Sequence, residues 1–147
     1  MSDNQPNHHD VEIALRAYEL RREPVMRESR DAIMKDFLPK NYEEFIAVTK
    51  PTHPLNAAFR QVSSYWEMVY GFCKYGAVHA NLFMESNAEG LFLFAKIRPF
   101  LDRFRKEGSP TAFMNAEWVA TQSEVGKNRL TYVEGRVAQM MEATANK

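Results

Sequence analysis

Apolar side chains recur at helical spacing most strongly between Leu55 and Tyr75, the longest pattern of this kind in the chain. At 100° per residue the apolar positions form two neighbouring stripes. The first stripe consists of Phe59, Val62, Trp66, Val69, Tyr70 and Cys73, and the second of Tyr65, Met68, Phe72 and Tyr75. The polar strip that remains consists of Arg60, Ser63, Ser64, Glu67, Gly71 and Lys74. Because this strip is narrow, we expect a central helix that meets water along it alone.

Weaker patterns of the same period predict further helices on both sides of the central one. The first follows Asp10, which we interpret as its N-cap, and kinks or restarts at Pro24. A short helix follows Asn41, which has Glu44 at capping-box spacing. Later segments are expected at about 77–86, 91–106, 110–125 and 127–144, with the segment 110–125 bent or ended by Gly126. In segment 91–106 we expect Lys96 to face away from the buried stripe.

These patterns together predict an all-α fold. The chain has no stretch in which apolar and polar residues alternate as they do in a half-buried strand. We predict a single-domain, mostly antiparallel bundle of five to seven helices around the central helix at about 55–75. The helical domain is expected to span residues 10–147 and to follow a flexible tail of residues 1–9, where His8 and His9 are interpreted as solvated side chains.

Composition and charge narrow the possible partners. The chain has 147 residues, and its 19 Lys and Arg balance its 19 Asp and Glu, so no net field attracts a polyanion. The longest uncharged apolar run, Leu91 to Ala95, is far shorter than the about 20 residues that cross a bilayer. The polar N-terminus shows no secretory pattern, and a single cysteine makes no internal disulfide. We therefore expect no nucleic acid, no membrane partner and a cytoplasmic location.

The search for catalytic chemistry gives negative results. The six glycines are scattered, so they form no phosphate-binding loop, and the sequence has no Cys-x-x-Cys pair. The Glu-x-x-His signature of di-metal helical bundles is also missing, because Glu67 is followed by Tyr70 at that spacing and Glu85 by Ala88. We therefore predict no catalytic residue, no cofactor and no metal, and lean towards a protein that is not an enzyme.

A low-ranked candidate for a ligand pocket lies among the aromatic residues of the central helix. Such a pocket would lie between helices, and His79 or Glu67 would supply the polar group that contacts the ligand. Its candidate residues are Trp66, Tyr70, Cys73, His79 and Trp118. For Cys73 and His79 the favoured interpretation is structural: a buried thiol in the core, and a side chain near the end of the central helix that interacts with its dipole.

A short set of residues resembles a group of small bacterial helical proteins of unknown function. The similarity covers about residues 55–118. It rests on Asn56, Phe59, Tyr65-Trp66-Glu67, Gly76, Leu82-Phe83 and Lys96-Ile97-Arg98-Pro99. Some members of that group carry an N-terminal membrane helix, which the polar residues 1–23 here do not provide. The resemblance implies no catalytic residues, because none are assigned in that group.

Two functions of different class are compatible with the sequence. The first is a non-enzymatic interaction module that binds a second copy, as a homo-dimer, or another protein, because its helices offer more large apolar side chains than a short bundle easily buries. A surface that includes part of the seam from Leu130 to Met141 would take part, although this seam could equally close onto the chain's own core. The alternative is a small-molecule-binding protein or cryptic enzyme that uses the aromatic pocket.

Overall fold

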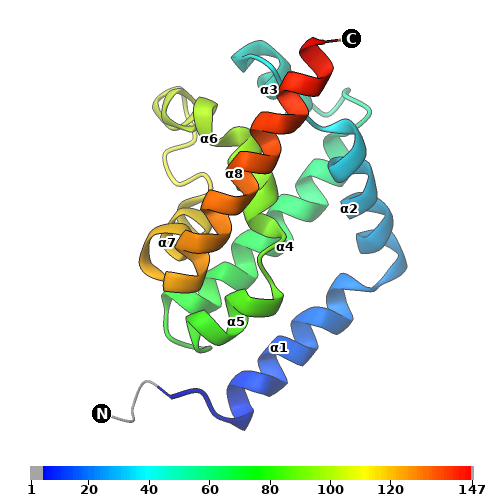
Figure 1. The fold of residues 1–147 in the computed structure, drawn as a ribbon. Coiled ribbons are helices and arrows are strands. Elements are labelled where there is room, and N and C mark those ends of the chain that lie inside the picture. Colours follow the sequence, from blue (N-terminus) through cyan, green and yellow to red (C-terminus); the bar gives the residue numbers. More distant parts are fainter. Residues whose placement is uncertain (1–4, 147) are drawn as a thin grey trace.

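The computed structural model describes residues 5–146 and is helical throughout, with turns and loops between the helices (Figure 1). The helices are α1 (His8–Arg21), α2 (Pro24–Asp36), α3 (Tyr42–Val48), α4 (Asn56–Lys74), α5 (Ala80–Ser86), α6 (Gly90–Lys106), α7 (Met114–Gln122) and α8 (Glu124–Ala145). The all-α prediction is confirmed. The described residues form eight helices, one more than the predicted maximum, because the chain breaks at Pro24 and again at Ser123. Ser123 caps α8 through its side chain, so the second break precedes Gly126.

The core is built around α4, as the sequence predicted, and α6 shares that position. α4 packs against α2 and α7, and α6 packs against α8 (Figure 1). Trp66 on α4 is 2% exposed, which confirms that its stripe faces the core. At one end of the core, Phe45 of α3 contacts the rings of Phe59, Phe100 and Phe104. These aromatic contacts join α3, α4 and α6.

The polar strip of α4 faces water only in part: Arg60 and Ser64 are exposed as predicted, but the part around Glu67 and Gly71 packs against α7. Both carboxylate oxygens of Glu67 accept hydrogen bonds from α7, from the backbone N–H groups of Asn115 and Ala116, each at 2.9 Å. Gly71 is buried beside Asn115, whose side-chain nitrogen would lie 2.8 Å from an added Cβ. This part of the polar strip therefore binds the N-terminus of α7, where unpaired N–H groups and the helix dipole favour a carboxylate.

The second apolar stripe of α4 is consequently turned outward along much of its length. Met68 is 48% exposed, Phe72 38% and Tyr75 80%, although the sequence pattern predicted that they would be buried. Tyr65 alone of this stripe is buried. Because the polar positions around Glu67 pack against α7, another face of α4 is exposed to solvent. Here that face is apolar.

Lys96 is a second departure from the sequence pattern, because it is 1% exposed. Its ammonium donates to the carbonyl oxygen of Ile33 near the end of α2 at 3.2 Å, and it lies 5.1 Å from the centre of the Phe92 ring. Burial lowers the pKa of Lys96 to about 8. α6 is covered on both sides, so a position that would face water on a surface helix here faces α2.

The start of α1 also differs from the prediction. Asn7 is the N-cap, and Asp10 lies three residues further on, where its carboxylate accepts the backbone N–H of Asn7 at 2.8 Å. His8 and His9 belong to the first turn of the helix. The rest of the predicted tail lies partly outside the described residues.

The C-terminal seam packs against the chain's own core. Leu130, Val133 and Val137 of α8 are buried, and Met140 and Met141 are partly buried. α8 contacts α6, α7 and α5. Of the two arrangements that the sequence allowed for this seam, the structure has the intramolecular one.

Candidate functional site

α1 lies at the edge of the bundle and contributes little to the core (Figure 1). Only Asp10 and Ala17 of this helix are buried. Its large apolar side chains are exposed instead: Val11 by 44%, Leu15 by 58%, Tyr18 by 45% and Leu20 by 40%. An edge helix with so many exposed apolar side chains is a candidate binding element.

An apolar groove of about 260 Å³ runs between α1 and α4. Its lining residues are Ile13, Arg16, Ala17, Leu20, Met68, Val69, Phe72 and Ala77. Leu20 and Met68 also line a second groove of about 370 Å³, beside the junction of α1 and α2. We call the exposed apolar surface formed by Leu20, Met68, Phe72 and Tyr75 the α1–α4 face. It is continuous because Met68, Phe72 and Tyr75 occur at helical spacing and Leu20 shares both grooves with Met68.

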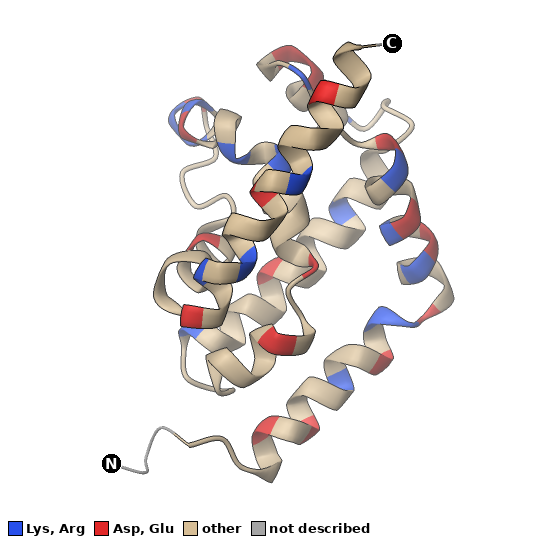
Figure 2. Ribbon diagram, in the orientation of Figure 1, with Lys and Arg blue, Asp and Glu red and all other residues tan. Residues whose placement is uncertain are grey.

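Charged residues are sparse on α4 and dense on α2. α2 has six charged residues within 13 positions, and Figure 2 shows them close together along that helix. α4 has three in 19 positions, Arg60, Glu67 and Lys74. Arg16 is the charged member of the lining of the α1–α4 groove. The α1–α4 face therefore adjoins a highly solvated surface but is itself apolar.

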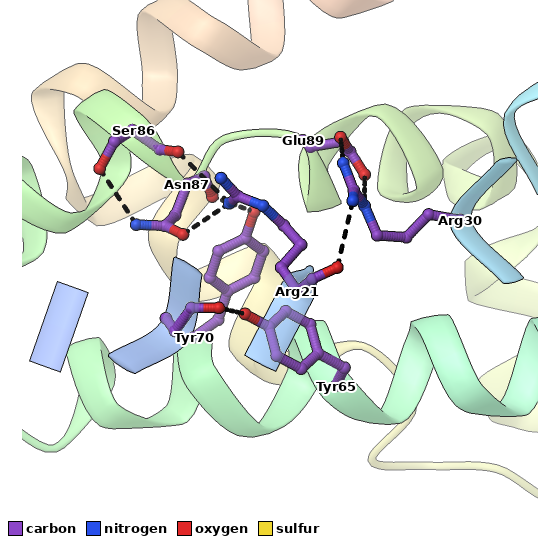
Figure 3. Close-up of polar contacts among 8 residues, drawn as sticks. Arg21, Arg30, Tyr65, Tyr70, Ser86, Asn87 and Glu89 are labelled. Carbon is purple, nitrogen blue, oxygen red and sulfur yellow. Dashed lines mark hydrogen bonds and ion pairs between the residues drawn. The ribbon is translucent and has the colours of Figure 1, made fainter. Parts of the chain in front are cut away.

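Polar contacts hold α1 to the rest of the molecule at three places along the helix. At its first turn the Asp10 carboxylate accepts the backbone N–H of His79 at 2.9 Å. In its third turn the carbonyl oxygen of Ala17 accepts the hydroxyl of Tyr65 at 2.5 Å. At its last residue the Arg21 guanidinium donates to the side-chain oxygen of Asn87 at 2.7 Å (Figure 3). The contacts thus lie at both ends and in the body of the helix.

The acceptor of Arg21 is itself rigidly placed in the turn between α5 and α6. Asn87 is 1% exposed, and its amide donates to the carbonyl oxygen of Phe83 at 3.1 Å. The hydroxyl of Tyr70 donates to the carbonyl oxygen of Asn87 at 2.8 Å (Figure 3). Gly90, the first residue of α6, follows this turn, and an added Cβ there would lie 2.6 Å from both Trp66 and Tyr70. The close packing around this turn fixes where α1 docks.

Arg30 of α2 completes the polar cluster drawn in Figure 3. It forms a bidentate ion pair with Glu89, at 2.7 and 2.6 Å, and donates to the carbonyl oxygen of Arg21 at 3.3 Å. The ion pair raises the pKa of Arg30. α2 is thereby tied to the α5–α6 turn and to the end of α1.

Hydrogen bonding and burial shift the pKa values of two residues in this region, Asp10 and Tyr70. Hydrogen bonds from the backbone N–H groups of Asn7 and His79 lower the pKa of Asp10. Burial raises the pKa of Tyr70 well above its ordinary value. Asp10 therefore makes its contact as a carboxylate and Tyr70 as a neutral hydroxyl that donates.

The predicted pocket residues are placed on three different elements, α4, α5 and α7. Trp66 and Tyr70 pack against each other on α4, with ring centres 5.4 Å apart. Cys73 is buried further along α4, and burial raises the pKa of its thiol to about 12. His79 is the N-cap of α5, where its Nδ1 accepts the backbone N–H of Leu82 at 3.2 Å. Trp118 is a partly buried residue of α7. The ligand pocket among these five stays a prediction.

Sequence reasoning missed the residues that now define the site. Arg21 and Asn87 are 66 positions apart, and no local pattern links them. The stripe of Met68, Phe72 and Tyr75 was identified but assigned to the core. The exposed residues of α1 had a usable signal, since Val11, Leu15 and Tyr18 recur at helical spacing without the large buried partners that a core helix has.

The described residues lack both a metal-binding cluster and a membrane-spanning helix. Residues 5–146 contain no group of three or more His, Cys, Asp or Glu side chains that could hold a metal ion. In the same range, no helix has the length and apolar character needed to span a membrane.

Comparison with known proteins gives one match. A family model described as "Domain of unknown function (DUF4760)" matches residues 7–123, which extends the resemblance beyond residues 55–118 to include α1 through α7. Neither the curated proteins nor the solved structures contain a match to this chain. Because the matched segment is well over half of the chain, this protein belongs to the family of the domain of unknown function DUF4760.

Proposed function

We propose that this protein is a non-enzymatic interaction module that self-associates as a dimer through the α1–α4 face. The observation that carries the proposal is the exposure of Met68, Phe72 and Tyr75 on the helix that otherwise forms the core. Large apolar side chains gathered on one surface and bordered by polar residues are typical of protein interfaces.

The net charge of the chain favours a second copy of the same chain as the partner. The chain has a formal net charge of zero, so two copies approach without net repulsion. The α1–α4 face offers no charged cluster that would select a strongly acidic or basic partner. An isologous dimer places the same apolar surface on both sides of the interface, which suits a face of this composition.

The flexible and aromatic side chains of the α1–α4 face also favour its use as a dimer interface. Met68 adapts to an imperfect partner surface through its unbranched side chain. Phe72 and Tyr75 are of the residue class that contributes most to binding when it becomes buried at an interface centre. A stable dimer would bury more than about 1,000 Å² in total.

Sedimentation equilibrium between about 1 and 100 μM, the range in which weak dimers of this size dissociate, tests the proposal. We expect the average mass to rise with concentration towards that of two 17.0 kDa chains. A mass of one chain over the whole range contradicts self-association.

The alternative function, a small-molecule binder or cryptic enzyme, has its own test. It requires a ligand among Trp66, Tyr70, Cys73, His79 and Trp118. Native mass spectrometry of the purified protein would reveal a retained small molecule as a discrete mass above that of the chain. Such an adduct, lost on substitution of Tyr70→Phe but retained in Phe72→Glu, would favour the pocket over the α1–α4 face.

A further inference from the structure

We infer that the two copies of the proposed dimer exchange α1, so that the α1 of each chain docks on the α4 and α5 of its partner. This inference rests on the proposed self-association and specifies how the second copy binds. Its first support is the weak apolar attachment of α1, because Ala17 is the one apolar side chain of this helix that is fully buried, and Ile13 and Ala14 are only partly buried against the core. Little hydrophobic burial therefore opposes the departure of α1 from its own chain.

The attachments that α1 does have can be remade in full between chains. Asp10 to His79, Ala17 to Tyr65 and Arg21 to Asn87 each join α1 to a residue of α4 or of the segments around α5. Figure 3 shows the contact from Arg21 to Asn87. The contact from Arg30 to the end of α1 likewise comes from outside α1. A partner chain offers the same groups in the same arrangement, so exchange loses none of these hydrogen bonds.

The connection between α1 and α2 favours exchange because it is short. It consists of Arg22 and Glu23 and ends at Pro24, the first residue of α2. Glu23 has an extended backbone, with φ −56° and ψ 138°, and its carboxylate caps α2 through the N–H of Met26 at 2.9 Å. A change in the backbone of these two residues redirects all of α1 while α2 keeps its cap. Domain swapping exchanges an element between two copies through a change in the hinge that joins it to the rest of its chain.

The length of the hinge also decides where the two copies meet. Two extended residues span about 7 Å, so the acceptor site on the partner has to lie beside the hinge. Leu20 is two residues before Arg22, and it lines with Met26 and Met68 the groove of about 370 Å³ at the junction of α1 and α2. Exchange therefore brings this groove and the Leu20–Met68 part of the α1–α4 face of both copies together. The new apolar contact is what favours the exchanged dimer over two closed monomers.

A disulfide between the first turn of α1 and the N-cap of α5 tests this inference. The hydrogen bond between Asp10 and His79 places these residues close enough for the variant Asp10→Cys/His79→Cys to be oxidised to a disulfide. Cys73 remains in place, because its buried thiol with a pKa of about 12 does not compete. Oxidised protein is then separated on a denaturing, non-reducing gel, and the native protein is sedimented in parallel.

Exchange predicts a covalent dimer as the main oxidised product and a dimeric mass in sedimentation. An internally cross-linked monomer from protein that sediments as a dimer overturns exchange and leaves the proposed function intact. A monomeric mass in sedimentation overturns both.

A second measurement decides the matter if the disulfide does not form. Unmodified protein is unfolded and refolded as an equal mixture of chains carrying ¹³C-labelled alanine and unlabelled chains. Isotope-filtered nuclear Overhauser effects between the labelled Ala17 methyl group and the ring of an unlabelled Tyr65 are expected in the exchanged dimer. Effects confined to labelled pairs within one chain overturn the exchange.

Discussion

The first and last helices of the chain differ in where they place their apolar side chains. α8 directs Leu130, Val133 and Val137 into the core and leaves Tyr132 outside. α1 buries Ala17 and leaves Leu15 and Tyr18 in solvent. Both helices carry apolar residues at helical spacing, so spacing alone does not distinguish a core helix from a docking element. What separates them is the surface available opposite each stripe.

The family match also separates α1 from α8. The matched residues 7–123 include α1 and end at the N-cap of α8. The exposed apolar surface of α1 and α4 thus lies inside the family domain, whereas the buried seam of α8 lies outside it. For this reason the α1–α4 face is the feature to test as the family's functional surface.

The largest expected effect compares one leucine from each helix. Leu130→Ala should lower the free energy of unfolding by about 2–4 kcal/mol, because it leaves a cavity under α8. Leu15→Ala, at a position 58% exposed, should change it by less than about 0.5 kcal/mol. Urea denaturation of the two variants beside the parent protein measures both. Equal losses would contradict the difference between the helices.

Removing the buried charge of α6 should stabilise the fold. Lys96→Met keeps the apolar shape and removes an ammonium that burial disfavours, so we expect a gain on the order of 2 kcal/mol at pH 7. The folded pKa of about 8 lies below the unfolded value of 10.5, so the unfolded chain binds more protons between these values. The parent protein should therefore gain stability as pH rises through this window, and the variant should not. Denaturation at pH 7 and pH 10 checks both; a constant difference between the proteins would contradict this reason for the gain.

Glu67→Gln tests why the second apolar stripe of α4 is exposed. The substitution removes the charge that faces the N-terminus of α7 and replaces one acceptor by a donor beside a backbone N–H. We expect a loss of about 1 kcal/mol in the free energy of unfolding. Glu44→Gln, at another helix N-terminus, is the control, since its own capping contact is exposed. A loss at position 67 no greater than the control would show that this contact does not orient α4.

The smallest expected effect concerns the pH dependence of the α1 contact. The folded pKa of Asp10 lies below its ordinary value, so this carboxylate contributes stability above about pH 4 that is lost as pH falls through the folded pKa. Asp10→Asn should remove that contribution and make α1 exchange its amide hydrogens faster than the parent at pH 7. Hydrogen exchange resolved by helix measures it. Unchanged protection of α1 would show that Asp10 does not secure this helix.

Much of the fold follows from the sequence, because periodicity identifies helices wherever one face is buried. The stripe around Trp66 and the seam around Val133 are examples. The orientation of α4 about its own axis does not follow, since Glu67 binds backbone N–H groups 48 and 49 positions away. The burial of Lys96 does not follow from the sequence either, because nothing near it in the sequence indicates that α2 supplies a carbonyl oxygen.

The residues of the candidate site are harder to predict from the sequence than the fold is. Its anchor, Arg21 to Asn87, joins segments whose proximity arises only from the packing of α1 beside α5. The surplus of apolar residues was visible in the sequence, but its position was not. The sequence allowed the C-terminal seam either to take part in a dimer surface or to close onto the chain's own core, and it did not indicate that the α1–α4 face would be exposed.

One measurement tests most directly whether the α1–α4 face, and not α8, mediates self-association. Sedimentation equilibrium is run on Phe72→Glu and on Tyr132→Glu, which introduce the same charge at exposed aromatic positions of α4 and α8. Because burying an unpaired carboxylate at an interface is costly, Phe72→Glu should sediment as a single chain at concentrations where the parent is dimeric. Tyr132→Glu should retain the parent's dimeric mass. A dimer that survives Phe72→Glu and is lost in Tyr132→Glu would contradict the account.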